Sequence, residues 1–393
     1  MALDEQLHTP EFFIGDPFPT FKHLRTESPL HWYEPNGYWA VTRWADVRFV
    51  SSRPDLFSSA SGVTIPEVGE PPPTQEGNIL FMDPPSHRRL RRLVSSGFTP
   101  RHIADLEVRA RTMARQILDG VTLDTTSEFA ESIAAPLPVW MIAELLGAPA
   151  EDWEDFRRWS DAAVGGADPD IELDATTALV ELTHYFERLI AERRDALRDD
   201  ILSDLMAAEV DGESLSDDDL LTFAWLLMVA GNETTRNLIA LGTLALIEHP
   251  EERRKLVDDP SLIPSAVEEM LRWCSPVAHM ARCALTDVEL RGQTIRKGDF
   301  VVLYYGSADR DEEVFGDDAE EFKVTRSPNP HVAFGFGEHL CLGASLARLE
   351  ARVMFEELLA RFPDFELVGD VVRMRSNMVP GVKRMPVRFL QRV

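Results

Sequence analysis

A glycine-rich stretch with a single cysteine, Phe334 to Arg348, most constrains what this chain can fold into. It reads FGFGEHLCLGASLAR, with Gly335 and Gly337 before Cys341 and Gly343 after it. Apolar residues recur downstream at helical spacing, so the cysteine marks the point where a loop becomes a helix. Unpaired N–H groups and the helix dipole stabilise a thiolate there. Because glycines let the backbone approach a large flat ligand, the stretch is suited to holding a haem iron through sulfur.

For an isolated cysteine a second interpretation stays open, in which a buried structural thiol lies beside an ordinary glycine turn. The chain has three cysteines, Cys274, Cys283 and Cys341. Their number is odd and no two have C-x-x-C spacing. The sequence therefore supports neither a disulfide framework nor a zinc site.

A long predicted helix is the second strong feature. Ser216 and Asp219 have the spacing of a capping box, and Pro250 stops the pattern after His249. At the rise of an α-helix such a segment is ~50 Å long. We therefore expect it to cross the whole body of a domain.

The middle of this helix reads AGNETT, residues 230–235. Gly231 weakens a helix and Thr234 can bond back to a carbonyl, so we expect a bent or widened turn with room for a small ligand. Glu233 beside Thr234 places an acid next to a hydroxyl, the combination that proton delivery to reduced dioxygen requires. An ordinary glycine-containing helix is the alternative.

Two further pairs lie on predicted helices. His87 and Arg91 are four residues apart, so both side chains lie on one helix face and can reach anionic carboxylates. Glu269 and Arg272 are three residues apart and can pair, which at a protein surface contributes little. Each pattern is weak alone, because charged helix faces are commonly just solvated.

Taken together, these strings resemble the cytochrome P450 family, and the resemblance covers essentially the whole chain. The family's haem-binding signature, F-G-x-G-x-H/R-x-C-x-G, is matched at Phe334, Gly335, Gly337, His339, Cys341 and Gly343. AGNET is similar to the family's A/G-G-x-D/E-T signature, with Glu in place of the commoner Asp. The resemblance implies a mainly α fold with small β-sheets. We expect one cytochrome P450 domain over residues 1–393, with a β-rich N-terminal lobe at about 30–80 and a helical body at about 81–286 and 340–362.

The resemblance also implies roles for individual residues. Cys341 is expected to be the metal ligand of haem b (iron protoporphyrin IX), with Phe334, Gly335 and Gly343 shaping its loop. The haem propionates are expected to be bound by His87, Arg91, Arg282 and His339. Glu233 and Thr234 are expected to be catalytic, and Glu269 with Arg272 to form a buried structural lock. The expected substrate pocket is lined by Val229, Ala230, Val277, Met280, Met378 and Val379.

The implied activity is that of a haem-thiolate monooxygenase. It uses O2 and two electrons from a ferredoxin, itself reduced by a ferredoxin reductase, to hydroxylate a hydrophobic small molecule. The strings AGNETTRN and IPSAVEEMLRW are similar to those of bacterial enzymes that oxidise sterol side chains, terpenoids and branched lipids. We favour a steroid or terpenoid substrate. A fatty acid or polyketide-type substrate and a non-catalytic haem-binding protein are the alternatives.

Charge and hydropathy bear on partners and location. The net charge is −27, from 67 acidic and 40 basic residues, so nucleic acid and anionic lipid are poor partners. The first residues lack a basic region followed by an apolar run, and no stretch approaches ~18 apolar residues. We expect a cytoplasmic monomer without a membrane partner. Arg88, Arg89 and Arg92 form a local basic patch that we expect to dock the electron donor.

Overall fold

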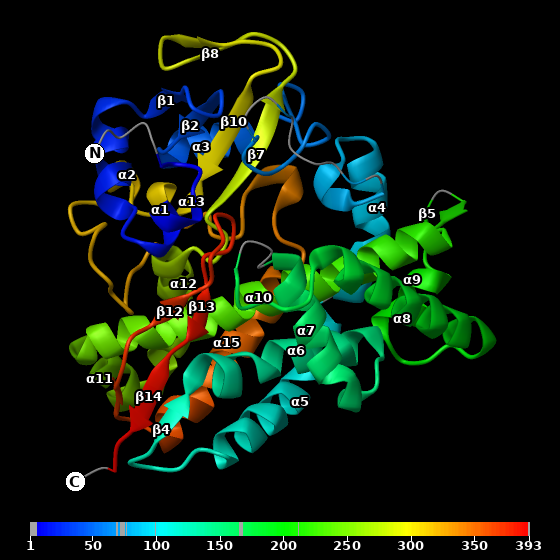
Figure 1. Cartoon of the computed structure of the whole chain (residues 1–393), viewed down its shortest axis with the longest axis vertical. Helices are drawn as coiled ribbons and strands as arrows, with labels where there is room; N and C mark the ends of the chain where they lie inside the picture. The colour runs from blue at the N-terminus through cyan, green and yellow to red at the C-terminus, as the bar shows by residue number, and fades with distance from the viewer. Residues whose placement is uncertain are drawn as a thin grey trace.

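The computed structural model describes residues 6–67, 70, 75, 77–98, 100–164, 168–210 and 212–391 (Figure 1). The helices are α1 (Pro10–Ile14), α2 (Phe18–Glu27), α3 (Trp44–Ser51), α4 (Ser86–Val94), α5 (Pro100–Asp119), α6 (Pro136–Leu146), α7 (Trp153–Val164), α8 (Ala175–Asp195), α9 (Ile201–Ala207), α10 (Asp217–Glu248), α11 (Pro250–Asp258), α12 (Ile263–Cys274), α13 (Tyr305–Ala308), α14 (Glu312–Phe315) and α15 (Ala344–Arg361).

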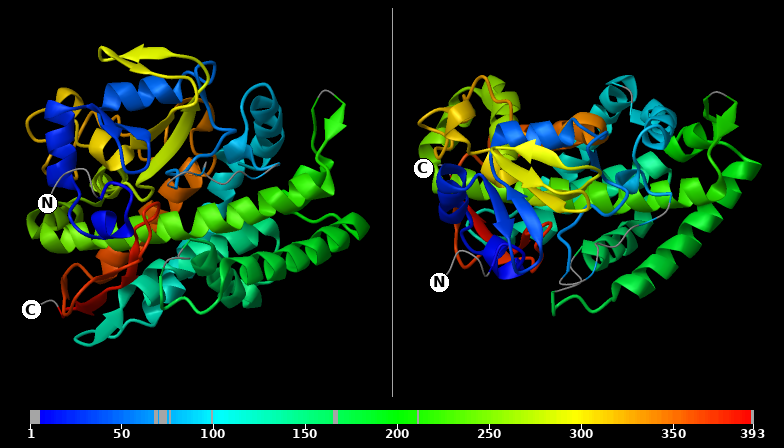
Figure 2. Two further views of the ribbon diagram at one scale, coloured as in Figure 1. Left: turned by 45° about the horizontal axis from the view of Figure 1, so that its top comes forward. Right: turned by 90° about the horizontal axis from the view of Figure 1, so that it is seen from above.

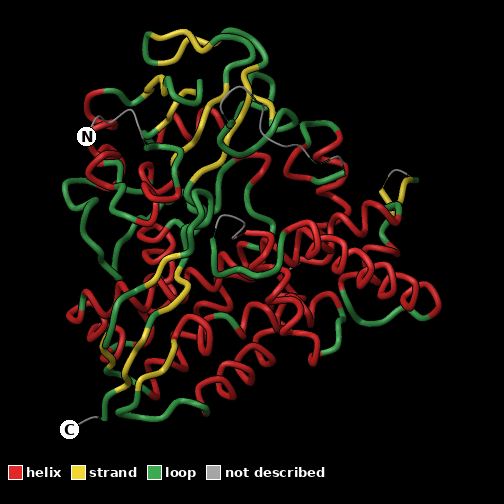
Figure 3. Tube along the Cα trace, in the orientation of Figure 1, coloured by secondary structure: helices red, strands yellow, loops and turns green. Residues whose placement is uncertain are grey.

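The strands are β1 (Leu30–Tyr33), β2 (Tyr38–Val41), β3 (Phe57–Ser58), β4 (Thr126–Glu128), β5 (Glu209–Val210), β6 (Glu213–Ser214), β7 (His279–Ala284), β8 (Val288–Leu290), β9 (Gln293–Ile295), β10 (Phe300–Tyr304), β11 (Phe365–Leu367), β12 (Val372–Arg373), β13 (Val382–Arg384) and β14 (Pro386–Phe389). Most of them gather in one lobe and along the edge near the C-terminus, and helices fill the rest (Figure 3). The expected mainly α fold with small sheets is confirmed. None of the described helices is long and apolar enough to cross a membrane.

One five-stranded sheet forms the β-rich lobe, in the order β1-β2-β10-β7-β3. β10 runs parallel to β2 and antiparallel to β7, with Val302 opposite both Ala40 and Ala281. Val301 and Leu303 of β10 pack into one apolar cluster, whereas Val302 and Tyr304 pack into another on the opposite face. Because side chains alternate along a strand, a strand covered on both faces is apolar throughout.

This sheet draws on both halves of the chain. Within the described part of the N-terminal lobe predicted at about 30–80, the strands are β1, β2 and β3, while β7 and β10 come from residues 279–304. The difference arises because β10 joins β2 in parallel, and parallel neighbours need a long crossover that local sequence patterns do not reveal.

The predicted long helix is confirmed as α10. The Ser216 hydroxyl accepts a hydrogen bond from the Asp219 N–H at 3.1 Å, and the Asp219 carboxylate accepts one from the Ser216 N–H at 3.0 Å. Figure 2 shows α10 crossing the molecule, with the β-rich lobe on one side and α6, α7 and α8 on the other. Every segment that forms the candidate site is therefore arranged around one helix.

Gly231 lies where α10 packs closely against α6. The α-helical pattern of α10 is unbroken from Asp217 to Glu248, so the predicted widened turn is wrong. A Cβ placed on Gly231 would lie 2.7 Å from Cγ1 of Ile142 on α6, closer than side-chain atoms approach. The Thr234 hydroxyl does bond back, donating to the Ala230 carbonyl at 2.8 Å.

We expect Gly231→Ala to destabilise the protein by about 1–3 kcal/mol, because the overlap with Ile142 exceeds the gain in helix propensity. The measurement is the free energy of unfolding from denaturant titration. Ile142→Val removes Cδ1, the Ile142 atom nearest to the added Cβ, so the double variant should recover part of the loss. A purely additive double variant would contradict the packing explanation.

Candidate active site

The Cys341 loop precedes α15 and is held by its own backbone. Gly335 and Gly337 have φ angles of 71° and 73°, which favour glycine. The Cys341 N–H donates to the Phe334 carbonyl at 3.0 Å. A Cβ on Gly337 would press against the Ser51 carbonyl group at the end of α3, so the loop and α3 fit only without a side chain there.

Cys341 is an exposed residue, although protein surrounds its thiol on most sides. Burial raises the pKa of this thiol, while the Gly343 N–H and the positive charges of Arg91 and Arg348 act in the opposite direction. The start of the helix thus favours the thiolate, as predicted, but burial outweighs it. A metal cation at the sulfur would add the positive charge needed to deprotonate the thiol.

Four basic side chains from three parts of the chain gather near Cys341: His87, Arg91, Arg282 and His339. The His87 and His339 ring centroids are 4.3 Å apart, and Arg91 donates to the Leu340 carbonyl at 2.6 Å. Burial, followed by the positive charges of Arg282, His87 and Arg91, lowers the pKa of His339 to about 2. The structure therefore brings the predicted propionate-binding residues together.

This basic cluster fits a dianionic ligand such as the two propionates of haem. His87 is 1% exposed, and neither of its ring nitrogens has a hydrogen-bond partner among the described residues. The carboxylate of Glu338 approaches no closer than 3.9 Å to His87 Nδ1. Because buried polar groups are normally paired, unpaired imidazole nitrogens beside two buried or half-buried arginines indicate an anionic partner.

Phe334 is held by a group of residues that the sequence did not reveal. The guanidinium of Arg348 lies 4.6 Å from the Phe334 ring centroid, and its two N–H groups donate to Glu268 at 2.7 and 2.9 Å. His331 Nε2 lies 3.1 Å from the same carboxylate. Burial of Glu268 opposes its charge, but the bonds from His331 and Arg348 prevail and lower its pKa to about 2. These contacts fix the ring beside the cysteine loop.

Glu233 and Thr234 occupy neighbouring positions on α10 but have different partners. The Glu233 carboxylate accepts from Arg236 at 2.8 Å, and Arg236 also donates to Asp161 of α7 at 2.9 Å. Burial raises the pKa of Glu233 to about 7, and the negative charge of Asp161 adds to the increase although Arg236 opposes it. Among the described residues, no hydrogen bond joins the Glu233 side chain to that of Thr234.

The raised pKa of Glu233 predicts a pH-dependent stability. Between the usual carboxyl pKa of 4.5 and about 7 the folded state retains a proton that the unfolded state releases. The contribution of Glu233 to the free energy of unfolding is therefore fully present below pH 4.5 and is lost as the pH rises toward 7. Relative to Glu233→Gln, the wild-type free energy of unfolding should fall by up to ~3 kcal/mol across that window.

Denaturant titrations from pH 4 to 8 on both proteins measure this difference. Asp161→Asn is the matched control, because removing the neighbouring negative charge should lower the Glu233 pKa and move the window to lower pH. Parallel pH profiles for the wild type and Glu233→Gln would contradict the assignment.

Glu269 and Arg272 form a buried pair at the end of α12. Both side chains are fully buried, and the two guanidinium bonds to the carboxylate are 2.8 and 2.7 Å long. Arg272 also donates to the backbone carbonyls of Asp309, Ala319 and Glu321. The pair thus ties α12 to the irregular segment that leads to the cysteine loop.

The predicted pocket residues come from three segments. The Ala278 N–H donates to the Met378 carbonyl at 2.8 Å, which places the Val277–Met280 segment beside Met378. Val379 is buried, whereas Val229 is partly exposed and Ala230 is exposed on α10. Ala230 lies one turn before Thr234, so the apolar face of α10 continues from the Thr234 hydroxyl.

Comparisons with known proteins agree with this geometry. The family model described as Cytochrome P450 matches residues 171–382. A methyl-branched lipid omega-hydroxylase of Mycobacterium tuberculosis is 39% identical over 390 residues, covering 94% of this chain and 90% of that protein. A steroid C26-monooxygenase of Mycolicibacterium smegmatis is 38% identical, covering 95% and 90%. The solved structure of CYP109E1 from Bacillus megaterium in complex with testosterone has a TM-score of 0.86 and 35% identity, covering 95% and 99%.

Proposed function

Because this chain belongs to the cytochrome P450 family of haem-thiolate monooxygenases, we propose that it hydroxylates a steroid or terpenoid. One observation supports assigning this function to particular residues of the chain. Cys341 lies just before α15 beside four basic side chains, and one of them, the buried His87, has no hydrogen-bond partner for either ring nitrogen among the described residues. A cysteine ligand and a site for two carboxylates are the two requirements for binding haem through its iron and its propionates.

In this proposal Cys341 is the iron ligand, and His87, Arg91, Arg282 and His339 bind the propionates. Haem bound there supplies dioxygen activation and the oxidising power for C–H hydroxylation. Phe334, fixed by Arg348 at 4.6 Å, limits the movement of the cysteine loop. The chain forms a single domain over residues 1–393 with one haem.

Glu233 and Thr234 serve proton delivery. A carboxyl with a pKa of about 7 is able both to take up and to release a proton at neutral pH. The Thr234 hydroxyl donates to the Ala230 carbonyl at 2.8 Å, in the same helix turn as Glu233. In this proposal the hydroxyl passes the proton on, either by rotating or through a water molecule. Arg236 and Asp161 hold the Glu233 carboxylate in place between transfers.

The substrate class rests on apolar surroundings and on the relatives. The proposed pocket residues Val229, Ala230, Val277, Met280, Met378 and Val379 are all apolar, which suits a hydrophobic molecule. The relatives named above act, by their names, on a methyl-branched lipid and on a steroid, and the solved structure holds testosterone. A fatty acid or a polyketide intermediate is the second candidate class.

Electrons come from a ferredoxin and its reductase in this proposal. Arg88, Arg89 and Arg92 are exposed on α4, which also carries His87 and Arg91 of the haem site. A basic patch on an otherwise acidic protein attracts an acidic donor to this face, and such attraction weakens with salt. The enzyme acts as a cytoplasmic monomer alongside its reductase.

Turnover with a ferredoxin, a ferredoxin reductase and NAD(P)H tests the proposal. Steroids and terpenoids are first screened for a low-spin to high-spin change in the purified holoenzyme, and products from those that bind are analysed by mass spectrometry. The expected result is a product heavier by one oxygen atom, formed more slowly at high salt. Haem binding without any product across these classes would favour the non-catalytic alternative.

A further inference from the structure

One face of α3 packs against the segment that leads to Cys341. Trp44, Arg48 and Ser51 follow one another at intervals of four and three residues, so they lie on the same side of this helix. At the last of them, the Ser51 carbonyl group leaves no room for a side chain on Gly337. Arg48 lies one helix turn earlier and contacts the same segment through its guanidinium.

The Arg48 guanidinium lies between two aromatic rings. Its carbon Cζ is 4.3 Å from the centroid of the Trp44 ring and 4.0 Å from that of the Phe336 ring. A cation over the face of a ring is attracted by the negative charge of the π electrons, and the attraction increases when the cation loses water. Because Phe336 directly precedes Gly337, this contact holds the segment at the residue before its closest approach to α3.

The two rings are the partners that hold the Arg48 guanidinium. Among the described residues its buried Nε has no hydrogen-bond partner, and no carboxylate forms an ion pair with it. The other phenylalanine of the cysteine loop differs in this respect, because Arg348 over Phe334 is paired with the Glu268 carboxylate. The position of Arg48 therefore depends on Trp44 and Phe336 rather than on an anion.

Trp44 is itself fixed from two directions. Its backbone N–H donates to the Asp311 carboxylate at 2.9 Å, and its indole Nε1 donates to the Pro330 carbonyl at 2.8 Å. The ring on one side of Arg48 is thus anchored to the body of the protein. The ring on the other side belongs to the cysteine loop, so the guanidinium joins the loop to a fixed support.

The backbone of the cysteine loop connects Phe336 to Cys341. The Cys341 N–H donates to the Phe334 carbonyl at 3.0 Å, and the Leu340 N–H donates to the Gly337 carbonyl at 3.2 Å. These two bonds close the loop on itself on both sides of the Phe336 ring. A displacement of that ring from α3 is therefore passed on to the cysteine.

We propose that Arg48 is a positioning residue for the iron ligand, which holds Phe336 against α3 and thereby keeps the Cys341 sulfur in place. This inference rests on the proposed function, because it takes Cys341 as the ligand. Without the guanidinium, Phe336 loses its attraction to α3 and the loop gains freedom to move. The expected consequence is easier loss of thiolate ligation in a protein that is still folded.

The test measures how fast the reduced, carbon monoxide-bound holoenzyme loses the Soret band of thiolate ligation at a fixed temperature. Arg48→Met keeps a long side chain without the charge and should lose the band about three- to tenfold faster than the wild type, as expected for one cation–π contact. Arg48→Lys keeps a cation and should stay within about twofold of the wild type. Phe336→Leu removes the same contact from the other side, so adding it to Arg48→Met should have little further effect.

Two controls separate this role from a general loss of stability. Arg53→Met removes an exposed guanidinium that lies 5.9 Å from the Phe49 ring centroid and pairs with Asp55, and it should keep the wild-type rate. Val387→Ala creates a cavity in β14, which lies near the C-terminus and away from α3 (Figure 1). It should lower the free energy of unfolding but leave the rate of band loss close to that of the wild type.

The outcomes also distinguish this inference from the proposed function. If the wild type shows thiolate ligation but Arg48→Met loses it no faster, the positioning role of Arg48 is overturned and the proposed function stands. The same holds if Val387→Ala, at an equal loss of unfolding free energy, loses the band as fast as Arg48→Met. A wild type without thiolate ligation would overturn both.

Discussion

Cys341→Ser is expected to abolish thiolate ligation and reduce hydroxylation to background. A serine hydroxyl has a far higher pKa than a thiol and donates much less electron density to iron. The measurement is the difference spectrum of the reduced, carbon monoxide-bound protein. The wild type should show the long-wavelength Soret band of a thiolate-ligated haem, and the variant should lack it.

The loss should be local, because the contacts that shape this loop come from its backbone. The Cys341 N–H would still donate to Phe334, and Gly337 would still pack against Ser51. Circular dichroism of the variant should therefore match the wild type. Cys283→Ser, which changes a buried thiol in β7, is the control and should keep the Soret band. An unchanged band in Cys341→Ser would rule out this cysteine as the ligand.

The second large effect is expected from Arg272→Ala, which should destabilise the protein by about 3–5 kcal/mol. Removing the guanidinium leaves the fully buried Glu269 carboxylate without its nearest counter-charge and removes the donors to three backbone carbonyls. Only part of the charge is offset by Arg326, whose Nε lies 3.2 Å from the same carboxylate. Denaturant unfolding of purified protein measures the change.

Arg158→Ala provides a matched control, because Arg158 also forms a pair with an acid three residues away. Its partners Asp155 and Glu181 lie at 3.1 and 2.7 Å, but all of these side chains are exposed. An exposed pair of this kind contributes at most ~1 kcal/mol, so the control should lose far less stability. Equal losses of unfolding free energy in the two variants would show that burial does not increase the contribution of the Glu269–Arg272 pair.

The sequence predicted best those features whose residues are contiguous. The glycine loop around Cys341, the capping box at Ser216 and the Glu269–Arg272 pair each depend on neighbours within a few residues. Local backbone geometry places such residues together whatever the rest of the chain does. These predictions could therefore be made without knowing how the helices pack.

The sequence alone did not predict the features that depend on packing between distant segments. Asp161 shares Arg236 with Glu233 from another helix, and Glu268 reaches Arg348 across 80 positions. The reason for Gly231 is the position of Ile142 on α6, and the local helix argument led instead to a widened turn that is absent. None of these partners follows a spacing rule.

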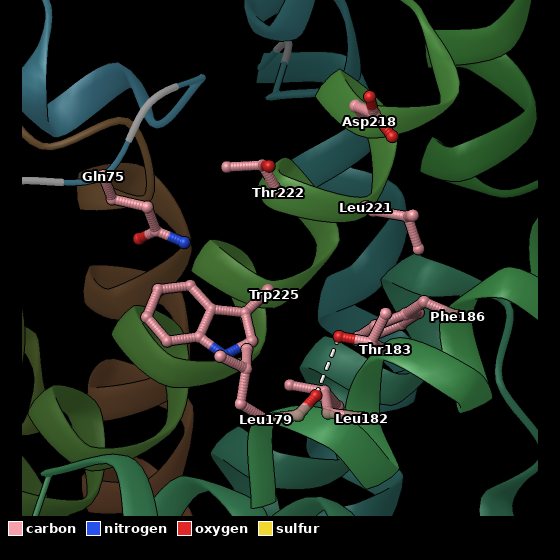
Figure 4. A pocket seen from close by; sticks show the side chains of 9 residues that line it. All are labelled: Gln75, Leu179, Leu182, Thr183, Phe186, Asp218, Leu221, Thr222 and Trp225. Atoms are coloured by element: carbon pink, nitrogen blue, oxygen red, sulfur yellow. Dashed lines mark hydrogen bonds between the residues drawn. The ribbon is translucent and has the colours of Figure 1, made fainter. Parts of the chain in front are cut away.

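Two crevices between α8 and α10, which share Leu179, Leu182 and Trp225 in their linings, were missed for a related reason; Figure 4 shows one of them. They need α8 to lie beside α10 with Gln75 near both, and the predicted pocket list followed family resemblance rather than packing. One signal was available: apolar and small residues repeat every four positions from Thr222 through Leu226 and Ala230 to Thr234. That period predicts a shared face, but not whether the face is covered.

Because Gly337 packs closely against Ser51, the cysteine loop can bind haem only after these distant segments have come together. The cysteine loop takes its shape against the end of α3, a segment almost 300 residues earlier in the chain. During synthesis α3 leaves the ribosome long before the cysteine loop, whose shape depends on it. Haem bound to a newly made chain therefore indicates that the cysteine loop already packs against α3.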